Sequence, residues 1–399
     1  TMLRRTLTPL DLVCAFVLSA CSDSKIPTSP DAADLNGTSL QAAKLAGAGS
    51  LTGEVGGATY YIEVPENWNG DLVLYAPGDV SPAYSADDFD PAGIEPNKRA
   101  QLLQRGYAWA TSSRSETGFA VQEGVRITHQ LRGIFTSRVD QPNRVYLSST
   151  SMGGLIMLRL LEQHPGMYAG ALPVCAPIVG AGGFWDGAFH TRALFDYYYP
   201  GVLGGDALNP PDGADGGAMF GAAFGAVQSD PGPAYELANA LPVPMPYADD
   251  VELGYIVGTQ IFFGDPVLLG EIKDRAHSED IFDNSMTVYA GTSDDAGLND
   301  GIDRFESSRQ ARNFFAHWYT PSGDLTAPVL SIRTTRDQTV SPYLDVLFAE
   351  RVAEAGKSDM FVWRQVDRFG HCNISSANEY GPAFDDLVDW VENGVMPTP

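Results

Sequence analysis

The chain has 399 residues, of which 44% are hydrophobic, so it can bury a large core and is not wholly disordered. Its length fits one large domain with an insertion, or two domains. Acidic residues outnumber basic ones by 50 to 25, which gives a net charge of −25. Most of this surface repels nucleic acid, and no basic cluster compensates, so nucleic acid is excluded as a partner. No uncharged apolar run reaches the roughly eighteen residues of an ordinary membrane-spanning helix.

The first twenty residues have the pattern of a secretory targeting segment. Arg4 and Arg5 give a positive start, an apolar stretch follows at residues 10–20, and small residues lead to Cys21. Residues 18–21 read Leu-Ser-Ala-Cys and resemble the bacterial lipobox. The resemblance implies that Cys21 carries lipid and becomes the first mature residue. We therefore expect a lipoprotein signal peptide and a chain exported to the cell envelope, anchored in the membrane through Cys21, although a buried N-terminal helix is the alternative.

The pattern after Cys21 predicts a tether and then a layered α/β core. Residues 21–50 are rich in small and polar side chains, as in a flexible tether. Apolar runs between turn residues predict strands at residues 58–64, 72–76, 106–111, 145–147, 171–174, 329–332 and 360–363. Helical periodicity predicts helices at residues 121–135, 152–163, 340–354 and 383–392, and residues 101–105 are expected to be the end of another helix. This alternation implies a mostly parallel central sheet flanked by helices, with residues 51–180 and 321–399 as the two parts of the core.

Residues 181–320 interrupt this alternation. The stretch is rich in Gly, Ala, Pro and aromatic residues and is too long to be a loop. We predict a mainly helical insertion that acts as a lid. Its aromatic side chains would either form a pocket for an acyl or aromatic group or simply make up the core of the insertion.

Residues 147–154 predict a strand, a sharp turn and a helix, with Ser151 at the turn. The stretch is close to the pattern Gly-x-Ser-x-Gly, in which small residues let the backbone pack tightly. Ser149 replaces the first glycine and Gly153 retains the second. A serine that simply caps the following helix is the alternative. We interpret Ser151 as a candidate nucleophile.

A serine nucleophile needs a histidine base and a carboxylate that orients the base. Of the six histidines, only His371 falls in a loop between a late strand and the final helix. Asp337 follows a predicted strand, whereas Asp345 falls inside a helix and Asp367 lies only four residues before His371. Ser151, Asp337 and His371 thus stand in the order serine, acid, histidine, each after a strand. We predict that they form a catalytic triad.

With these residues the chain resembles the α/β-hydrolases over residues 53–394. The resemblance implies hydrolysis by acyl transfer to water, in which Ser151 attacks a carbonyl, His371 carries the proton and Asp337 holds the imidazole. It also implies no cofactor and no metal. The oxyanion hole of that family would here use the backbone N–H groups of Met152 and Asp79.

The cysteine count predicts one disulfide. Cys14 would leave with the signal peptide and Cys21 would carry lipid, which leaves Cys175 and Cys372. Two cysteines in an exported chain favour a disulfide, with two separate buried thiols as the alternative. Cys175 ends a predicted strand beside that of the nucleophile, and Cys372 adjoins His371, so we expect the bond to tie the base to the core.

The substrate follows less directly from these residues. A cysteine beside the histidine resembles the tannase and feruloyl esterase group, although there a cysteine also precedes the nucleophile, where this chain has Thr150. We expect a carboxylic ester hydrolase for a small-molecule or polymeric ester. The alternatives are a serine peptidase similar to prolyl oligopeptidase and a non-catalytic surface lipoprotein on a hydrolase fold.

Overall fold

The computed structural model describes residues 44–79, 81–83, 85, 90–318 and 320–399. The predicted signal peptide, Cys21 and most of the predicted tether lie outside the described residues. Residues 44–50, expected as the end of the tether, belong to the folded part instead. The Leu45 N–H donates to the Arg138 carbonyl at 2.7 Å, and the first strand already begins at Gly49.

A single eight-stranded sheet forms the centre of the molecule, in the order β1-β2-β4-β3-β5-β6-β7-β8. The pairs β1–β2 and β2–β4 are antiparallel and the remaining pairs are parallel, as the alternation of elements predicted. The strands are β1 (Gly49–Val55), β2 (Ala58–Val64), β3 (Leu72–Ala76), β4 (Ala108–Ser112), β5 (Val145–Thr150), β6 (Gly170–Val174), β7 (Val329–Arg336) and β8 (Phe361–Phe369). Strand β1 was not predicted, because an edge strand with few large apolar residues carries a weak signal.

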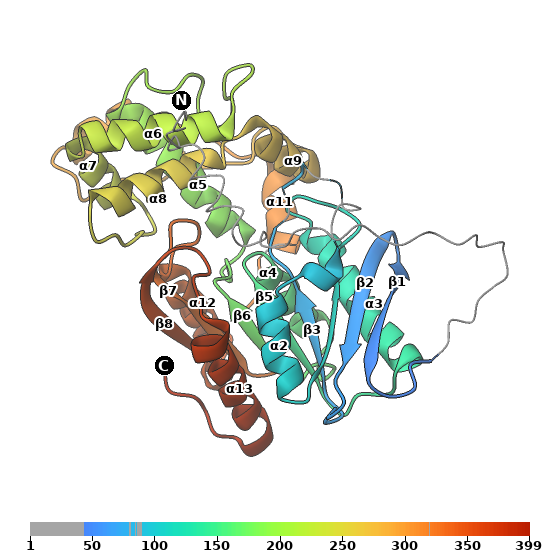
Figure 1. Ribbon diagram of the computed structural model, residues 1–399. Coiled ribbons are helices and arrows are strands. Elements are labelled where there is room, and N and C mark those ends of the chain that lie inside the picture. The colour runs from blue at the N-terminus through green and yellow to red at the C-terminus, as the bar shows by residue number, and fades with distance from the viewer. Residues whose placement is uncertain (1–43, 80, 84, 86–89, 319) are drawn as a thin grey trace, which may run out of the picture.

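Helices cover both faces of the sheet (Figure 1). These helices are α2 (Pro96–Gln104), α3 (Val121–Arg138), α4 (Gly153–Gln163), α12 (Tyr343–Glu354) and α13 (Gly381–Asn393). One core layer takes apolar side chains from α2 and α13, and the other takes them from α3, α4 and α12. Side chains of β3 alternate between these two layers and all five are buried, which explains why the strand reads as a continuous apolar run.

Seven helices lie between β6 and β7 in the chain, and most of them gather at one end of the sheet (Figure 1). They are α5 (Ala181–Tyr198), α6 (Gly216–Ser229), α7 (Gly232–Ala240), α8 (Asp250–Phe262), α9 (Pro266–Ala276), α10 (Asp295–Gly301) and α11 (Arg309–Trp318). The insertion has an apolar core of its own, built largely from α5 to α8. Within the described part of the chain, no single helix is long and apolar enough to cross a membrane, and only the bent pair α8 and α9 qualifies together by length and composition.

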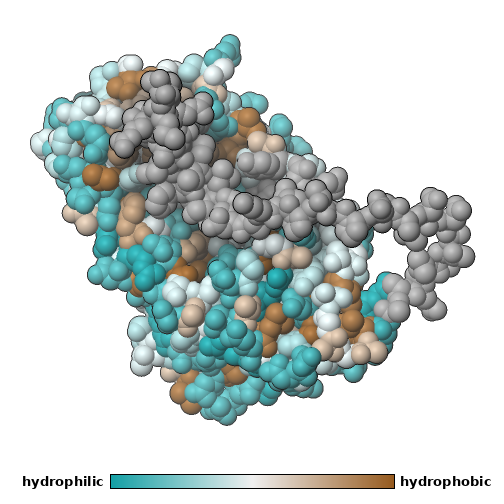
Figure 2. Space-filling model, in the orientation of Figure 1, coloured by the Kyte–Doolittle hydropathy of each residue, from teal (hydrophilic) through white to brown (hydrophobic). Residues whose placement is uncertain are grey.

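The surface of the described residues is largely hydrophilic on the face shown in Figure 2. Figure 2 shows hydrophilic residues over most of the visible face, with hydrophobic ones in small separate groups.

Candidate active site

Ser151 lies at a sharp turn between β5 and α4. Its backbone has φ 52°, in the left-handed region, and its N–H donates to the Val174 carbonyl at 2.8 Å. A Cβ added at Gly153 would lie 2.1 Å from the Ala76 carbonyl oxygen, so only glycine fits there without movement of the backbone. The turn therefore places the Ser151 side chain at the carboxyl ends of the parallel strands.

The structure brings the three predicted triad residues together. His371 Nε2 lies 3.0 Å from Ser151 Oγ, and His371 Nδ1 lies 2.8 Å from Asp337 Oδ2. The other Asp337 oxygen accepts from the N–H groups of Thr339 at 2.8 Å and Val340 at 2.9 Å. Because the carboxylate only accepts, Nδ1 carries the proton and Nε2 is left to accept from the serine hydroxyl. This is the arrangement in which an imidazole can take a proton from the serine.

The two competing carboxylates are engaged elsewhere. Asp345 is completely buried and forms an ion pair with Arg333, and burial raises the pKa of Asp345 although Arg333 opposes the shift. Asp367 is 84% exposed and lies 2.6 Å from Arg336. Asp337 therefore remains the carboxylate that contacts the histidine.

Two glutamines hold the loops of the acid and the base. Gln338 Oε1 accepts from the His371 N–H at 2.9 Å. Gln260, on α8, donates from Nε2 to the carbonyls of Gln338 at 2.9 Å and Thr339 at 3.1 Å. The insertion thus supports the acid loop directly. The sequence carried no signal for Gln260, because 78 positions separate it from Gln338.

The expected disulfide between Cys175 and Cys372 is present, with the two Cα atoms 5.3 Å apart. It connects the end of β6 to the residue after His371. The two cysteine sulfurs and a ring nitrogen of His371, which are atoms of the kind that bind metal ions, lie within 4.8 Å of one another. Because the two sulfurs are bonded to each other, they are not available as thiolate ligands.

The two predicted oxyanion donors, Met152 and Asp79, belong to different segments next to Ser151. Met152 directly precedes α4, and its N–H has no acceptor within the described residues. On the loop after β3, a Cβ added at Gly78 would lie 3.3 Å from the Ser151 Cβ, which places the Gly78–Asp79 peptide beside the serine. The Asp79 side chain is exposed, so its charge has access to solvent.

A polar cluster missed by the sequence reasoning lies beneath the turn. The hydroxyl of Thr150 contacts the Tyr75 hydroxyl, Lys98 Nζ at 2.8 Å and Glu95 Oε1 at 3.0 Å. Lys98 and Glu95 are themselves 2.8 Å apart. Burial alone would raise the pKa of Glu95, but Lys98 and the hydrogen bonds outweigh it and lower that pKa. The residue before the nucleophile is thus held by an ion pair where the tannase-like pattern has a cysteine.

Backbone strain concentrates around this site. Six non-glycine residues of the described chain have positive φ, and four of them belong to the groups just described. These four are Glu95, Ser151, Cys175 and Cys372. Such conformations cost on the order of 1–3 kcal/mol each and persist where the surroundings enforce them, typically at functional sites.

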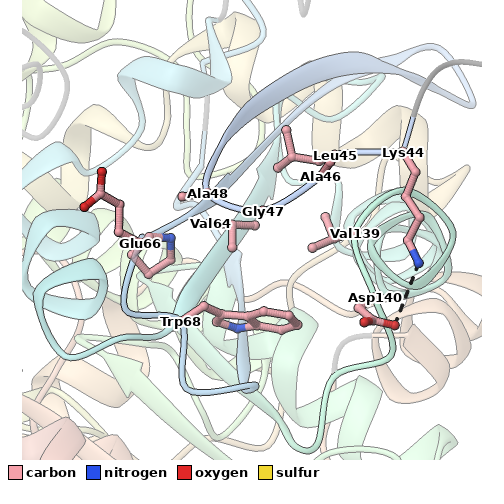
Figure 3. Close-up of a pocket in the computed structure, with 11 residues that line it drawn as sticks. Lys44, Leu45, Ala46, Gly47, Ala48, Val64, Glu66, Trp68, Val139 and Asp140 are labelled. Carbon is pink, nitrogen blue, oxygen red and sulfur yellow. Dashed lines mark ion pairs between the residues drawn. The ribbon is translucent and has the colours of Figure 1, made fainter.

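A cavity of about 490 Å³ (Figure 3) lies at the end of the sheet that is opposite to Ser151. Its wall includes Lys44, Trp68 and Asp140, and Lys44 forms an ion pair with Asp140. Val64, which also lines it, ends β2 beside the start of β4, whereas Ser151 follows the carboxyl end of β5. This cavity is therefore separate from the candidate active site.

Comparison of the sequence with known proteins finds one distant similarity over most of the chain. No protein-family model matches the chain. The o-phthalyl amidase of Xanthobacter agilis is 23% identical over 420 residues, which cover 88% of this chain and 89% of that protein.

Solved structures are similar over most of the chain. Feruloyl esterase B from Aspergillus oryzae superposes with a TM-score of 0.52 at 13% identity, over 87% of this chain and 80% of the esterase. The chain has the α/β-hydrolase fold. An esterase from Aspergillus oryzae gives a TM-score of 0.45 at 14% identity, over 85% of this chain and 78% of that chain.

Proposed function

We propose that this protein is a serine hydrolase that cleaves carboxylic esters, with Ser151 as nucleophile, His371 as base and Asp337 as the acid that orients it. The observation that carries the proposal is the continuous hydrogen-bonded chain from Asp337 Oδ2 through the imidazole to Ser151 Oγ. A non-catalytic lipoprotein would have no need of this chain or of the strained turn that presents the serine.

The reaction follows from the position of each group. Ser151 Oγ attacks the ester carbonyl while His371 Nε2 takes its proton, and Asp337 stabilises the imidazolium. The negative charge on the carbonyl oxygen is held by the N–H groups of Met152 and Asp79. The C–O bond of the ester then breaks, and His371 returns the proton to the leaving alcohol. Water repeats the sequence on the acyl-serine, releasing the acid and restoring the serine.

Amide hydrolysis is a second candidate, because the o-phthalyl amidase is related over 88% of the chain. The same residues would serve, with His371 giving its proton to the leaving nitrogen. A peptidase similar to prolyl oligopeptidase would use this chemistry too. Paired substrates separate the possibilities: p-nitrophenyl esters and the matching anilides with the same acyl groups, a phthalyl group among them, together with aminoacyl anilides. Faster cleavage of the esters, compared by kcat/KM, supports the esterase, and faster cleavage of an anilide overturns it.

A fluorophosphonate probe tests the nucleophile. Wild type should be labelled on Ser151, and Ser151→Ala should lose labelling and hydrolysis, the latter by roughly 10⁶-fold. Ser149→Ala is the matched control, because its hydroxyl is buried without a hydrogen-bond partner among the described residues. That variant should keep the label. Ser151→Ala with even a tenth of wild-type hydrolysis would remove Ser151 from this role.

We also propose export to the cell envelope, facing the periplasm or the cell surface, with lipid attached at Cys21. The support is the sequence pattern of residues 1–21 and the polar stretch that follows. Cys21→Ala should move the protein from the membrane fraction to the soluble fraction with unchanged specific activity, whereas Cys14→Ala should change neither. Membrane association of Cys21→Ala equal to that of wild type would contradict lipid attachment there.

A further inference from the structure

Arg114 is a buried arginine that neither the sequence nor the triad explains. It lies two residues after the end of β4, next to the end of β3, and only 1% of its surface is exposed. Its own backbone has φ 65°, in the left-handed region. Burying a guanidinium and straining its backbone both cost free energy, so the surrounding structure must use this side chain.

The guanidinium is directed at the loop beside the nucleophile. Arg114 Nη2 donates to the carbonyl oxygen of Gly78. A Cβ added at Gly124 on α3 would lie 3.6 Å from Arg114 Cδ, an ordinary van der Waals distance, so the stem of the arginine packs beside this helix.

Holding one end of a peptide bond fixes the other end. The Gly78–Asp79 bond is trans, as are all peptide bonds of the described chain, so its N–H points opposite to its C=O. With the carbonyl turned to Arg114, the Asp79 N–H is turned away from the guanidinium. Gly78 itself lies against Ser151 and the Thr150 carbonyl.

Given the nucleophilic role of Ser151, which rests on the function proposed above, we propose that Arg114 is the positioning residue of the oxyanion hole. It orients the Gly78–Asp79 peptide so that the Asp79 N–H faces the developing oxyanion. A hydrogen bond from a charged donor to the carbonyl also polarises the peptide, which makes its N–H a stronger donor.

The test compares Arg114→Met and Arg114→Lys with Arg126→Met. Arg126, on α3, is the matched control, because it also donates to a glycine carbonyl. Its Nη2 lies 3.2 Å from the carbonyl oxygen of Gly56. Arg114→Met should lower kcat on a p-nitrophenyl ester by roughly 10²–10³-fold, the loss seen when one oxyanion donor is removed, with little change in KM. Arg114→Lys should recover part of this loss, and Arg126→Met should match wild type.

Affinity for a boronic acid provides a readout that a purely structural role would not move. The tetrahedral boronate places an oxygen in the oxyanion hole, so its Ki should rise with the loss in kcat, while binding of the planar carboxylate product and the pH midpoint of kcat/KM stay the same. Unchanged Ki in Arg114→Met overturns the proposal. If that variant does not fold, Arg114→Lys decides: kcat and Ki both equal to wild type overturn it, and a shared loss of at least about tenfold supports it.

Failure here is distinguishable from failure of the proposed function. Wild type that takes no fluorophosphonate on Ser151 contradicts the serine hydrolase itself. Wild type that is labelled and inhibited by the boronate, while Arg114→Met retains full kcat and Ki, contradicts only the role of Arg114.

Discussion

At the candidate active site, the orientation of a single side chain depends on the groups that bind it. Asp337 is completely buried, yet two backbone N–H groups bind one of its oxygens and the imidazole binds the other. A carboxylate so satisfied is held in one orientation, which fixes the imidazole ring as well. Asp367, 84% exposed, has an arginine partner and no comparable constraint.

Asp337→Asn tests this difference at the residue scale. The amide would favour the wrong tautomer of His371, so kcat should fall by roughly 10⁴-fold with the fold intact. Asp367→Asn, measured on the same ester, should leave kcat unchanged. The reverse pattern would transfer the role to Asp367, and retention of activity by both variants would remove the acid from the mechanism.

Asp186, on α5, gives a prediction about pH. Burial, with the nearby charge of Asp283, raises its pKa from 3.8 to about 7. The native state therefore holds the proton more tightly than the unfolded state, so this residue lowers the free energy of unfolding as pH rises from about 4 to about 7. Asp186→Asn should be more stable than wild type at pH 8 by no more than about 4 kcal/mol, with a smaller gain at pH 5.

Urea unfolding at the two pH values measures the effect of Asp186. The matched control is Asp212→Asn, which makes the same change at an exposed aspartate of the same insertion. An equal gain for Asp186→Asn at both pH values would contradict a raised pKa at this position.

At the scale of elements, the unit formed by β5, the turn and α4 depends on close backbone contact. Gly153→Ala would push a Cβ to 2.1 Å from a backbone oxygen of β3, which cannot move without disturbing the sheet. We expect a loss of stability of about 1–3 kcal/mol and a strong loss of activity, because the turn that presents Ser151 must shift. Thermal unfolding and ester hydrolysis provide the measurements.

Gly133→Ala is the control for Gly153→Ala. Gly133 lies on the exposed side of α3 with no atom within 4 Å of an added Cβ, so alanine should stabilise the helix by up to about 1 kcal/mol. Stability and activity of Gly153→Ala equal to those of Gly133→Ala would contradict the close contact between α4 and β3.

Across the whole molecule, the disulfide closes a loop of 197 residues that contains the entire insertion and the acid. Replacing both cysteines, Cys175→Ala with Cys372→Ala, should lower stability by about 5 kcal/mol at most, because the unfolded chain gains entropy. Activity should fall as well, since Cys372 adjoins the base. The melting temperature of wild type should drop on reduction, and reductant should leave the double variant unchanged. Two free thiols in the purified protein, found by mass spectrometry, would contradict this.

The accuracy with which strands and helices were predicted depends on how strong the local sequence pattern is. Buried parallel strands such as β3 were found because their apolar runs are continuous. The edge strand β1 was missed, and α12 begins at Tyr343 instead of 340, because Val340 and Pro342 belong to the loop that holds Asp337.

The sequence by itself determined the fold class, the candidate triad and the pair of cysteines. Periodicity reveals strands and helices, and residues that follow parallel strands meet at one edge of the sheet, so Ser151, Asp337 and His371 were predictable from local context. Only the tertiary structure revealed the supporting contacts: Arg114 on the Gly78 carbonyl, Gln260 on the acid loop, and Lys98 with Glu95 on the Thr150 hydroxyl below the turn. These contacts join segments through packing, and nothing in the neighbouring residues of an isolated arginine or glutamine indicates which distant carbonyl it will meet.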